Sequence, residues 1–375
     1  MSDALPLPSR PNLEQYKKLA KDLQSACKST NPGAIRDWIA HWADTEASVA
    51  RIEKRWLEFK ESSEPAARCA LSAAQLFLAR AHGFASWPKF SAHLKASSRA
   101  GSFISLFEAA ADAIVNGEIS VLRTLLTNNP ELVRARSTRA HQSTLLHYVS
   151  ANGVEDYRQK TPANIVEIAD LFLTSGSDVN AESNAYGGSA TTLGLTATSW
   201  HPEQAGLQLP LLSLLLDHGA SVGNNAVTGC LANGRGQAAE FLANRGAPLD
   251  LEAAAGIGRL DLVQSLYPSA TQKQITDGFA WACEFGRTAV VDYLLQQGMD
   301  IAAKLRHFGQ TGLHWAAYGG HPDVVKLLLE RGAPLDAKDD TYEGTPLEWA
   351  KYAQQKSPRE SHSEVVALLA QAATR

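Results

Sequence analysis

The feature that most constrains the fold of this 375-residue chain is a recurring spacing of 34 residues. Four pairs of identical residues show this spacing: Trp281 and Trp315, Trp315 and Trp349, Gly286 and Gly320, and Gly298 and Gly332. A fixed period of about 20–50 residues is typical of stacked helical or mixed units, none of which can bury its apolar side alone. The spacing therefore predicts an elongated array of similar units rather than a closed bundle or a large sheet.

Residues 309–336 show one such unit from beginning to end. It opens with Thr311, Leu313 and His314, continues through apolar residues at helical spacing in 324–329, and closes at Gly332. This stretch resembles one complete ankyrin repeat, in which Thr-Pro-Leu-His-x-Ala begins the first of two helices. Gly312 stands where proline is usual, and residues 143–148 and 345–350 resemble the same opening.

From the repeats we predict an all-α fold, an ankyrin-repeat solenoid of about eight irregular repeats preceded by a small helical domain. The domains are 1–100, the N-terminal helical domain, and 101–375, the ankyrin-repeat domain. The expected copies are 103–136, 143–181, 188–222, 224–250, 251–274, 275–304, 308–337 and 343–374.

The copies are not uniform. Copies four and five lack the opening motif, and Gly219 and Gly246 are only 27 residues apart, so we expect their connecting fingers to be short or absent. Copies two, three and eight carry extra residues between their helices, at 154–163, 200–206 and 354–362. Two lengthened turns in adjacent copies would form a lip along one edge of the array.

The first hundred residues carry a different signature. They hold 15 Lys/Arg against 10 Asp/Glu, whereas the rest of the chain holds 20 against 29. An amphipathic helix is expected after Asn12, and further helices near 33–44, 46–60, 65–82 and 86–97. The segments 7–14, 82–88, 188–216 and 279–287 resemble a group of bacterial ankyrin proteins with a helical extension before the repeats. That resemblance implies a bacterial source and the fold, but no agreed activity.

Several classes of protein are disfavoured. Cys27, Cys69, Cys230 and Cys283 are widely spaced, so we expect reduced thiols in a cytoplasmic protein rather than a disulfide framework or a zinc site. The chain shows no signal peptide and no apolar run of transmembrane length. Its net charge of −4 argues against nucleic-acid or membrane-surface binding. We expect no metal site and no cofactor.

An aromatic row provides the first candidate site. Tyr148, Trp281, Trp315 and Trp349 occupy one equivalent position of the repeat, which is Gly229 and Ala253 in the middle copies. Either these rings wall a hollow over repeats three to six, or the position faces the next repeat and is packed core. The sequence leaves both alternatives open.

Polar residues near this row are further candidates. Glu284 lies beside Phe285, and Tyr318 holds the place of Glu284 one repeat later. A carboxylate against an apolar wall can have a raised pKa, although a solvated acid is the alternative. Glu252 opens a copy with no finger, where His147 and His314 stand in other copies to bond the neighbouring turn. Asn152 and Gly319 complete the expected open face.

The lip supplies one more constellation. Trp200, His201 and Glu203 place an imidazole and a carboxylate together, which could serve as general acid and base, but no nucleophile accompanies them. Catalytic residues therefore stay unknown, and whether the protein is an enzyme is left open.

Two functions follow from these patterns. The first is an interaction module that binds a protein or peptide on the concave face of the repeats. The alternative is an enzyme or small-molecule binder that uses an aromatic-walled pocket in repeats three to six. The ligand, any reaction, the role of the N-terminal helices and the oligomeric state are not determined by the sequence.

Overall fold

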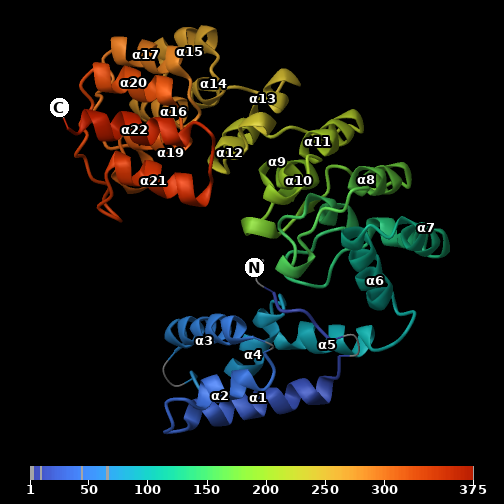
Figure 1. The fold of residues 1–375 in the computed structure, drawn as a ribbon. Helices are drawn as coiled ribbons and strands as arrows, with labels where there is room; N and C mark the ends of the chain where they lie inside the picture. The colour runs from blue at the N-terminus through green and yellow to red at the C-terminus, as the bar shows by residue number, and fades with distance from the viewer. Residues whose placement is uncertain (1–3, 9–10, 44, 65–66, 375) are drawn as a thin grey trace. The chain divides into compact units, whose positions relative to one another are not determined.

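The computed structural model describes residues 4–8, 11–43, 45–64 and 67–374. It is mostly helical, with 63% helix and 2% strand, so the predicted all-α class is confirmed. The chain divides into two compact units, Met1–Ser221 and Val222–Arg375, which are described separately below. Figure 1 shows the order of the elements.

Five helices precede the repeats, close to the predicted positions (Figure 1): α1 (Leu13–Lys28), α2 (Ala34–Ala40), α3 (Glu46–Glu61), α4 (Leu71–Ala81) and α5 (Trp87–Ser97). Asn12 caps α1, as expected, because its side chain accepts a hydrogen bond from the backbone N–H of Glu14 at 2.9 Å. Leu23, Ile52 and Trp56 are buried in the core of these helices. These helices therefore have a core of their own.

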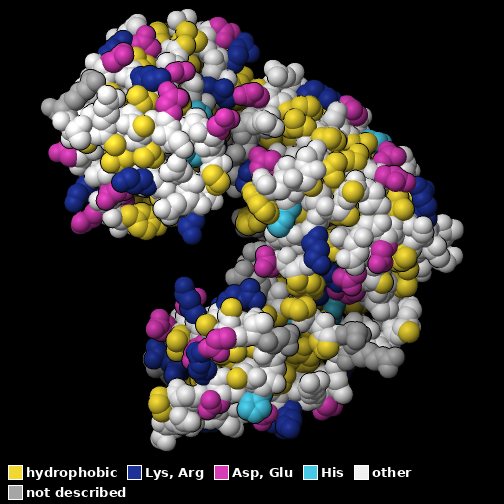
Figure 2. Space-filling model, in the orientation of Figure 1, with side chains coloured by type: hydrophobic (Ala, Val, Ile, Leu, Met, Phe, Trp, Pro, Cys, Tyr) yellow, Lys and Arg dark blue, Asp and Glu magenta, His cyan; other side chains and the backbone are white. Residues whose placement is uncertain are grey.

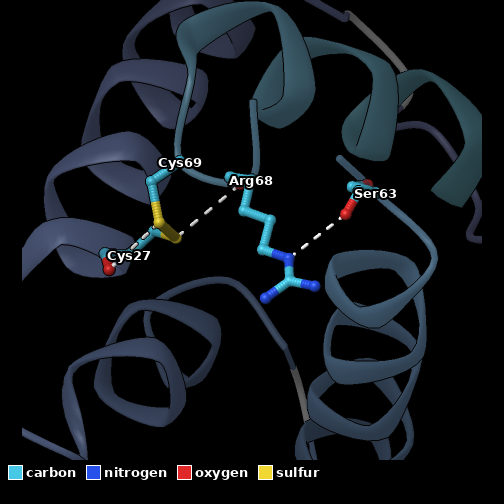
Figure 3. The surroundings of a disulfide bond; sticks show 4 residues. All are labelled: Cys27, Ser63, Arg68 and Cys69. Carbon is cyan, nitrogen blue, oxygen red and sulfur yellow. Dashed lines mark hydrogen bonds between the residues drawn. A yellow bond between two sulfur atoms is a disulfide. The ribbon is translucent and has the colours of Figure 1, made fainter. Parts of the chain in front are cut away.

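Cys27 and Cys69 form a disulfide bond, so the prediction of four reduced thiols is wrong for these two residues (Figure 3). Cys27 lies at the end of α1 and Cys69 just before α4, and their Cα atoms are 5.5 Å apart although 42 residues separate them in sequence. Packing of α1 against α4 brings them together, which no local pattern reveals. Cys230 and Cys283 are free and buried.

Eight helix pairs follow in the described residues. Three belong to the unit Met1–Ser221. Their elements are α6 (Phe103–Asn116) with α7 (Ile119–Asn128) and η1 (Pro130–Arg134); η2 (Leu145–Ser150) with η3 (Asp156–Arg158) and α8 (Ile165–Thr174); and α9 (Thr192–Thr198) with α10 (Trp200–Gln204) and α11 (Gln208–Asp217). A short antiparallel pair, β1 (Glu182–Ser183) and β2 (Ala190–Thr191), flanks η4 (Ala185–Gly187) in a finger. The segments η3 and α10 fill the two lengthened turns expected from the sequence.

Five pairs belong to the unit Val222–Arg375. They are α12 (Ala226–Ala232) with α13 (Gly236–Asn244), α14 (Leu251–Ile257) with α15 (Leu260–Leu266) and η5 (Tyr267–Ser269), α16 (Gln272–Glu284) with α17 (Thr288–Gln296), α19 (Gly312–Gly319) with α20 (Pro322–Glu330), and α21 (Pro346–Lys356) with α22 (His362–Ala372). The first helices contact one another in order from α12 to α21, and the second helices from α15 to α22. Two layers of helices therefore cover each other's apolar sides, as the repeat pattern predicts.

Fingers differ among the copies as expected. Only residues 245–250 connect α13 to α14, whereas residues 297–311, which include α18 (Arg306–Gly309), connect α17 to α19. Residues 331–345 form the next long connection. The long connections matter for function because they carry side chains over the first helices.

The repeat opening has the predicted role in structure. Nδ1 of His314 accepts a hydrogen bond from the backbone N–H of Thr311 at 3.1 Å, and Nε2 lies 3.0 Å from the carbonyl oxygen of Gly344. Gly312 replaces the usual proline because a Cβ there would lie 2.7 Å from Cε1 of Phe279, a buried ring of the preceding repeat. The residues of one copy thus hold the next in register.

The surface carries both signs of charge. Figure 2 shows Lys and Arg intermingled with Asp and Glu over the visible face. In the part of the chain that the structure describes, no helix has the length and apolar character to cross a membrane.

Candidate functional site

Three tryptophans form a row along the first helices of the last three repeats. Trp281 lies on α16, Trp315 on α19 and Trp349 on α21, each 34 residues from the next. Trp281 and Trp315 are only 6% and 7% exposed, and the ring of Trp315 meets that of Trp349 edge to face at 5.9 Å between centroids. The row is therefore packed between repeats, and it also forms one wall of a pocket.

A second row lies one helical turn further along. Glu284, Tyr318 and Tyr352 each follow one of the tryptophans by three residues, so they share its helix face. The ring of Tyr318 packs edge to face against Trp349, with centroids 5.8 Å apart, and Tyr352 is 57% exposed. The 34-residue period thus places a second line of side chains, one carboxylate and two tyrosine rings, beside the first.

The long connections supply the facing wall. Phe308 and Tyr342 are also 34 residues apart, at the same point of successive fingers, and are 52% and 75% exposed. Between the fingers and the helices, the guanidinium of Arg306 stacks over Trp281 and lies 4.8 Å from the ring centroid of Trp315. These contacts cover the aromatic rows from the finger side.

Arg306 and Glu284 form a buried ion pair in this wall. Nη2 of Arg306 donates to Oε2 of Glu284, and the two side chains are 10% and 15% exposed. Burial lowers the pKa of Arg306 to about 10, although Glu284 opposes that shift. Burial raises the pKa of Glu284 to about 7, against the opposing charge of Arg306. Glu284 is thus a partly buried acid rather than a solvated one.

The two rows and the fingers together line a pocket of about 810 Å³ that is open to solvent. Its lining residues come from the unit Val222–Arg375: Ala232, Asn233, Gly234, Trp281, Glu284, Arg306, Phe308, Gln310, Trp315, Tyr318, Tyr342, Glu343, Gly344, Glu348, Trp349 and Tyr352. Most of them belong to repeats six to eight, so the pocket lies closer to the C-terminus than the sequence analysis expects. The reason is that, within the unit Val222–Arg375, the fingers that form its second wall are long only in these copies.

The structure brings together five of the residues selected from the sequence: Trp281, Glu284, Trp315, Tyr318 and Trp349. Phe285 and Glu252 do not line the pocket. Phe285 packs instead against Trp281, with ring centroids 6.2 Å apart. Glu252 is half-buried, and burial raises its pKa, with the charges of Asp277 and Asp250 adding to the shift.

The proposed lip lies in the unit Met1–Ser221 and is not part of this pocket. Trp200 is 53% exposed and its ring meets that of His201 edge to face at 5.2 Å. Burial lowers the pKa of His201, with Asp156 of the adjacent turn opposing the shift. Glu203 lies on the same short helix, α10. Tyr148, the first member of the aromatic row, is fully buried there as packed core.

Sequence reasoning missed the rest of the pocket. The 34-residue period could have found Tyr352 from Tyr318, and Tyr342 from Phe308, because each pair repeats one position. The period does not reveal Arg306, since the equivalent residue one repeat later is Asp340. Its position depends on the conformation of the finger.

Comparison with known proteins assigns the C-terminal part of the chain. A family model described as "Ankyrin repeats (3 copies)" matches residues 251–339 and 279–374. No curated protein matches the chain. The matched residues hold all of the pocket except its α12 edge. The C-terminal part of this protein therefore consists of ankyrin repeats, and helices precede them.

Proposed function

We propose that this protein is an interaction module that binds a segment of a protein or peptide partner on the concave face of its ankyrin repeats, at the aromatic pocket. Ankyrin repeats generally mediate protein–protein interaction, and that association sets the expectation. The single observation that carries the proposal is the pocket of about 810 Å³ lined by exposed Phe308, Tyr342 and Tyr352. Aromatic side chains are enriched at protein interfaces, where they bury much area with few rotatable bonds.

Exposed apolar side chains that gather in one place commonly mark an interaction site, and Phe308, Tyr342 and Tyr352 gather around one pocket. Rings of Tyr present an apolar body with a polar tip, so they suit a face that is wet when free and covered when bound. Nothing in the comparisons favours the enzymatic alternative.

A site-specific photo-crosslinker tests the proposal. The photoreactive residue p-benzoylphenylalanine is placed at Tyr352 in the pocket and, as the matched control, at Leu57, which is 51% exposed on α3. We expect a defined partner to crosslink from position 352 and not from 57, and the adduct to be lost when Tyr342→Ser is added. Equal crosslinking from both positions, or none from 352 under mild conditions, would contradict the proposal.

The remaining sequence predictions belong with this proposal. We infer a cytoplasmic protein of bacterial origin with a boundary at residue 100 and no nucleic-acid or membrane partner. The Cys27–Cys69 disulfide counts against the cytoplasmic part of this inference, because the reducing cytosol of most cells keeps cysteine pairs as free thiols.

A further inference from the structure

The pocket has an unequal balance of charge. Three carboxylates line it, Glu284, Glu343 and Glu348, against the single cation Arg306 among the described lining residues. Arg306 is paired with Glu284. Neither Glu343 nor Glu348 forms an ion pair with a described residue, although Lys338 and Lys351 act on Glu348 from outside the pocket. The pocket is therefore complementary to a positive charge.

The guanidinium of Arg306 shows that the tryptophan rings can bind a cation. Its guanidinium sits against the faces of Trp281 and Trp315 with Glu284 as counter-ion, and its Nε and Nη1 atoms are buried without a hydrogen-bond partner among the described residues. The rings therefore supply the attraction that hydrogen bonds do not. One half of the pocket already contains a cation on two indole rings.

In the other half of the pocket, the next two tryptophans of the row contact each other edge to face, with ring centroids 5.9 Å apart. Trp315 and Trp349 stand there at the positions of Trp281 and Trp315, each 34 residues on. The indole N–H of Trp349 donates to Oδ2 of the buried Asp339 at 3.0 Å, which fixes the ring and puts negative charge at its edge. Tyr318 and Tyr352 complete this half, and no guanidinium of a described residue stacks on Trp349.

Two carboxylates of the pocket, Glu348 and Glu343, also favour a cationic ligand. Glu348 accepts hydrogen bonds from the backbone N–H and the hydroxyl of Thr345, and these bonds lower its pKa, so it is ionised at neutral pH. Glu343 has φ 50°, a left-handed conformation that costs free energy for a residue other than glycine. Such strain is common at binding sites, and here it falls on a pocket carboxylate.

We propose that Tyr318, Trp349 and Tyr352 bind the arginine or lysine side chain of an extended peptide segment in this half of the pocket, with Glu343 and Glu348 as its counter-ions. This inference rests on the proposed function, since it names the chemistry of the segment that the pocket receives. The volume of about 810 Å³ exceeds one side chain, and exposed Phe308 and Tyr342 continue the apolar surface for neighbouring residues of the segment.

A random heptapeptide display library, panned on the full chain, tests this inference. We expect the selected peptides to be enriched in Arg and Lys. Replacing the basic residue of a selected peptide by Gln weakens binding roughly tenfold or more, which calorimetry measures. The double variant Glu343→Gln/Glu348→Gln gives a similar loss. Thr345 still caps α21, and Gln in place of Glu348 can still accept a hydrogen bond from its backbone N–H, so this variant keeps its helix start. The control Glu330→Gln, an exposed carboxylate outside the pocket, leaves binding unchanged.

The outcomes separate the two proposals. If selected peptides lose binding in Tyr352→Ala but show no basic enrichment and no effect of the double Gln variant, the cationic inference is overturned while the pocket remains a peptide site. If no selected peptide depends on Tyr352, both proposals fail. If arginine methyl ester alone binds the pocket as tightly as the selected peptide does, the ligand is a small cation and the peptide assignment is wrong.

Discussion

Glu284 illustrates how the fold sets the chemistry of a single residue. Glu284 is the last residue of α16, and its side chain lies beside two indole rings. Arg306, 22 residues further along the chain, reaches it from a finger. Burial and the ion pair act in opposite directions on its pKa, and burial dominates. The sequence suggested an acid against an apolar wall through the neighbouring Phe285, whereas the structure forms the wall from Trp281, Trp315 and the finger.

We predict that Glu284 titrates near neutral pH. Its pKa of about 7 in the folded protein exceeds the ordinary value of 4.5, so folding favours the protonated form. Its contribution to stability is complete below pH 4.5 and decreases as the pH rises to about 7, by up to about 3 kcal/mol. Carboxyl NMR titration, assigned with Glu284→Gln, checks the pKa. A stability difference between wild type and Glu284→Gln that is constant over this range would refute it.

At the scale of elements, the disulfide joins the end of α1 to the start of α4. The two helices pack against each other along the core that contains Leu23 and Phe77, so the bond closes a contact that packing already makes. A sequence pattern could not show it, because the pairing depends on how two helices separated by α2 and α3 meet in space. Cys230 and Cys283 are free and buried inside the repeats, which agrees with the reduced thiols expected from the sequence.

We predict that loss of this bond destabilises the N-terminal helices. Closing a loop with a sequence separation of 42 stabilises a fold by about 4 kcal/mol on the chain-entropy account. Cys69→Ser should lower the melting temperature, which differential scanning calorimetry measures, and a reducing agent should reproduce the effect on wild type. Thiol titration of the unfolded, unreduced chain should count two thiols, and four thiols would rule out the bond.

At the scale of the whole molecule, buried charges join the N-terminal helices to the first repeats within the unit Met1–Ser221. Arg139 pairs with Glu108 and Glu155, and its guanidinium carbon lies 5.4 Å from the ring centroid of Phe84, in the segment after α4. The backbone N–H of Ala140 also donates to the carbonyl oxygen of Gly83 at 2.8 Å. The domain boundary at residue 100 stays a prediction. If it exists, these contacts connect the two domains on either side of it.

We predict that Arg139→Leu weakens this junction selectively. It removes one of the two arginines, Arg139 and Arg158, that pair with the buried Glu108 and Glu155, and the negative charge left uncompensated costs about 3–5 kcal/mol. The matched control Arg123→Leu breaks an exposed pair with Glu167 and costs about 0–1 kcal/mol. Hydrogen exchange measured by mass spectrometry should accelerate around residues 83–158 in the first variant. Equal acceleration in Val222–Arg375, or none in either unit, would show that the network does not hold this junction.

The period of 34 residues was sufficient to predict helix pairs, their stacking and the tryptophan row, because those features depend on local spacing and on the need of each pair for cover. It also contained the second row, Glu284, Tyr318 and Tyr352. The tertiary structure alone decided where Arg306 lies, how the long fingers fold over the helices, and that Cys27 meets Cys69. These depend on loop conformation and on contacts between distant residues, and neither leaves a periodic trace in the chain.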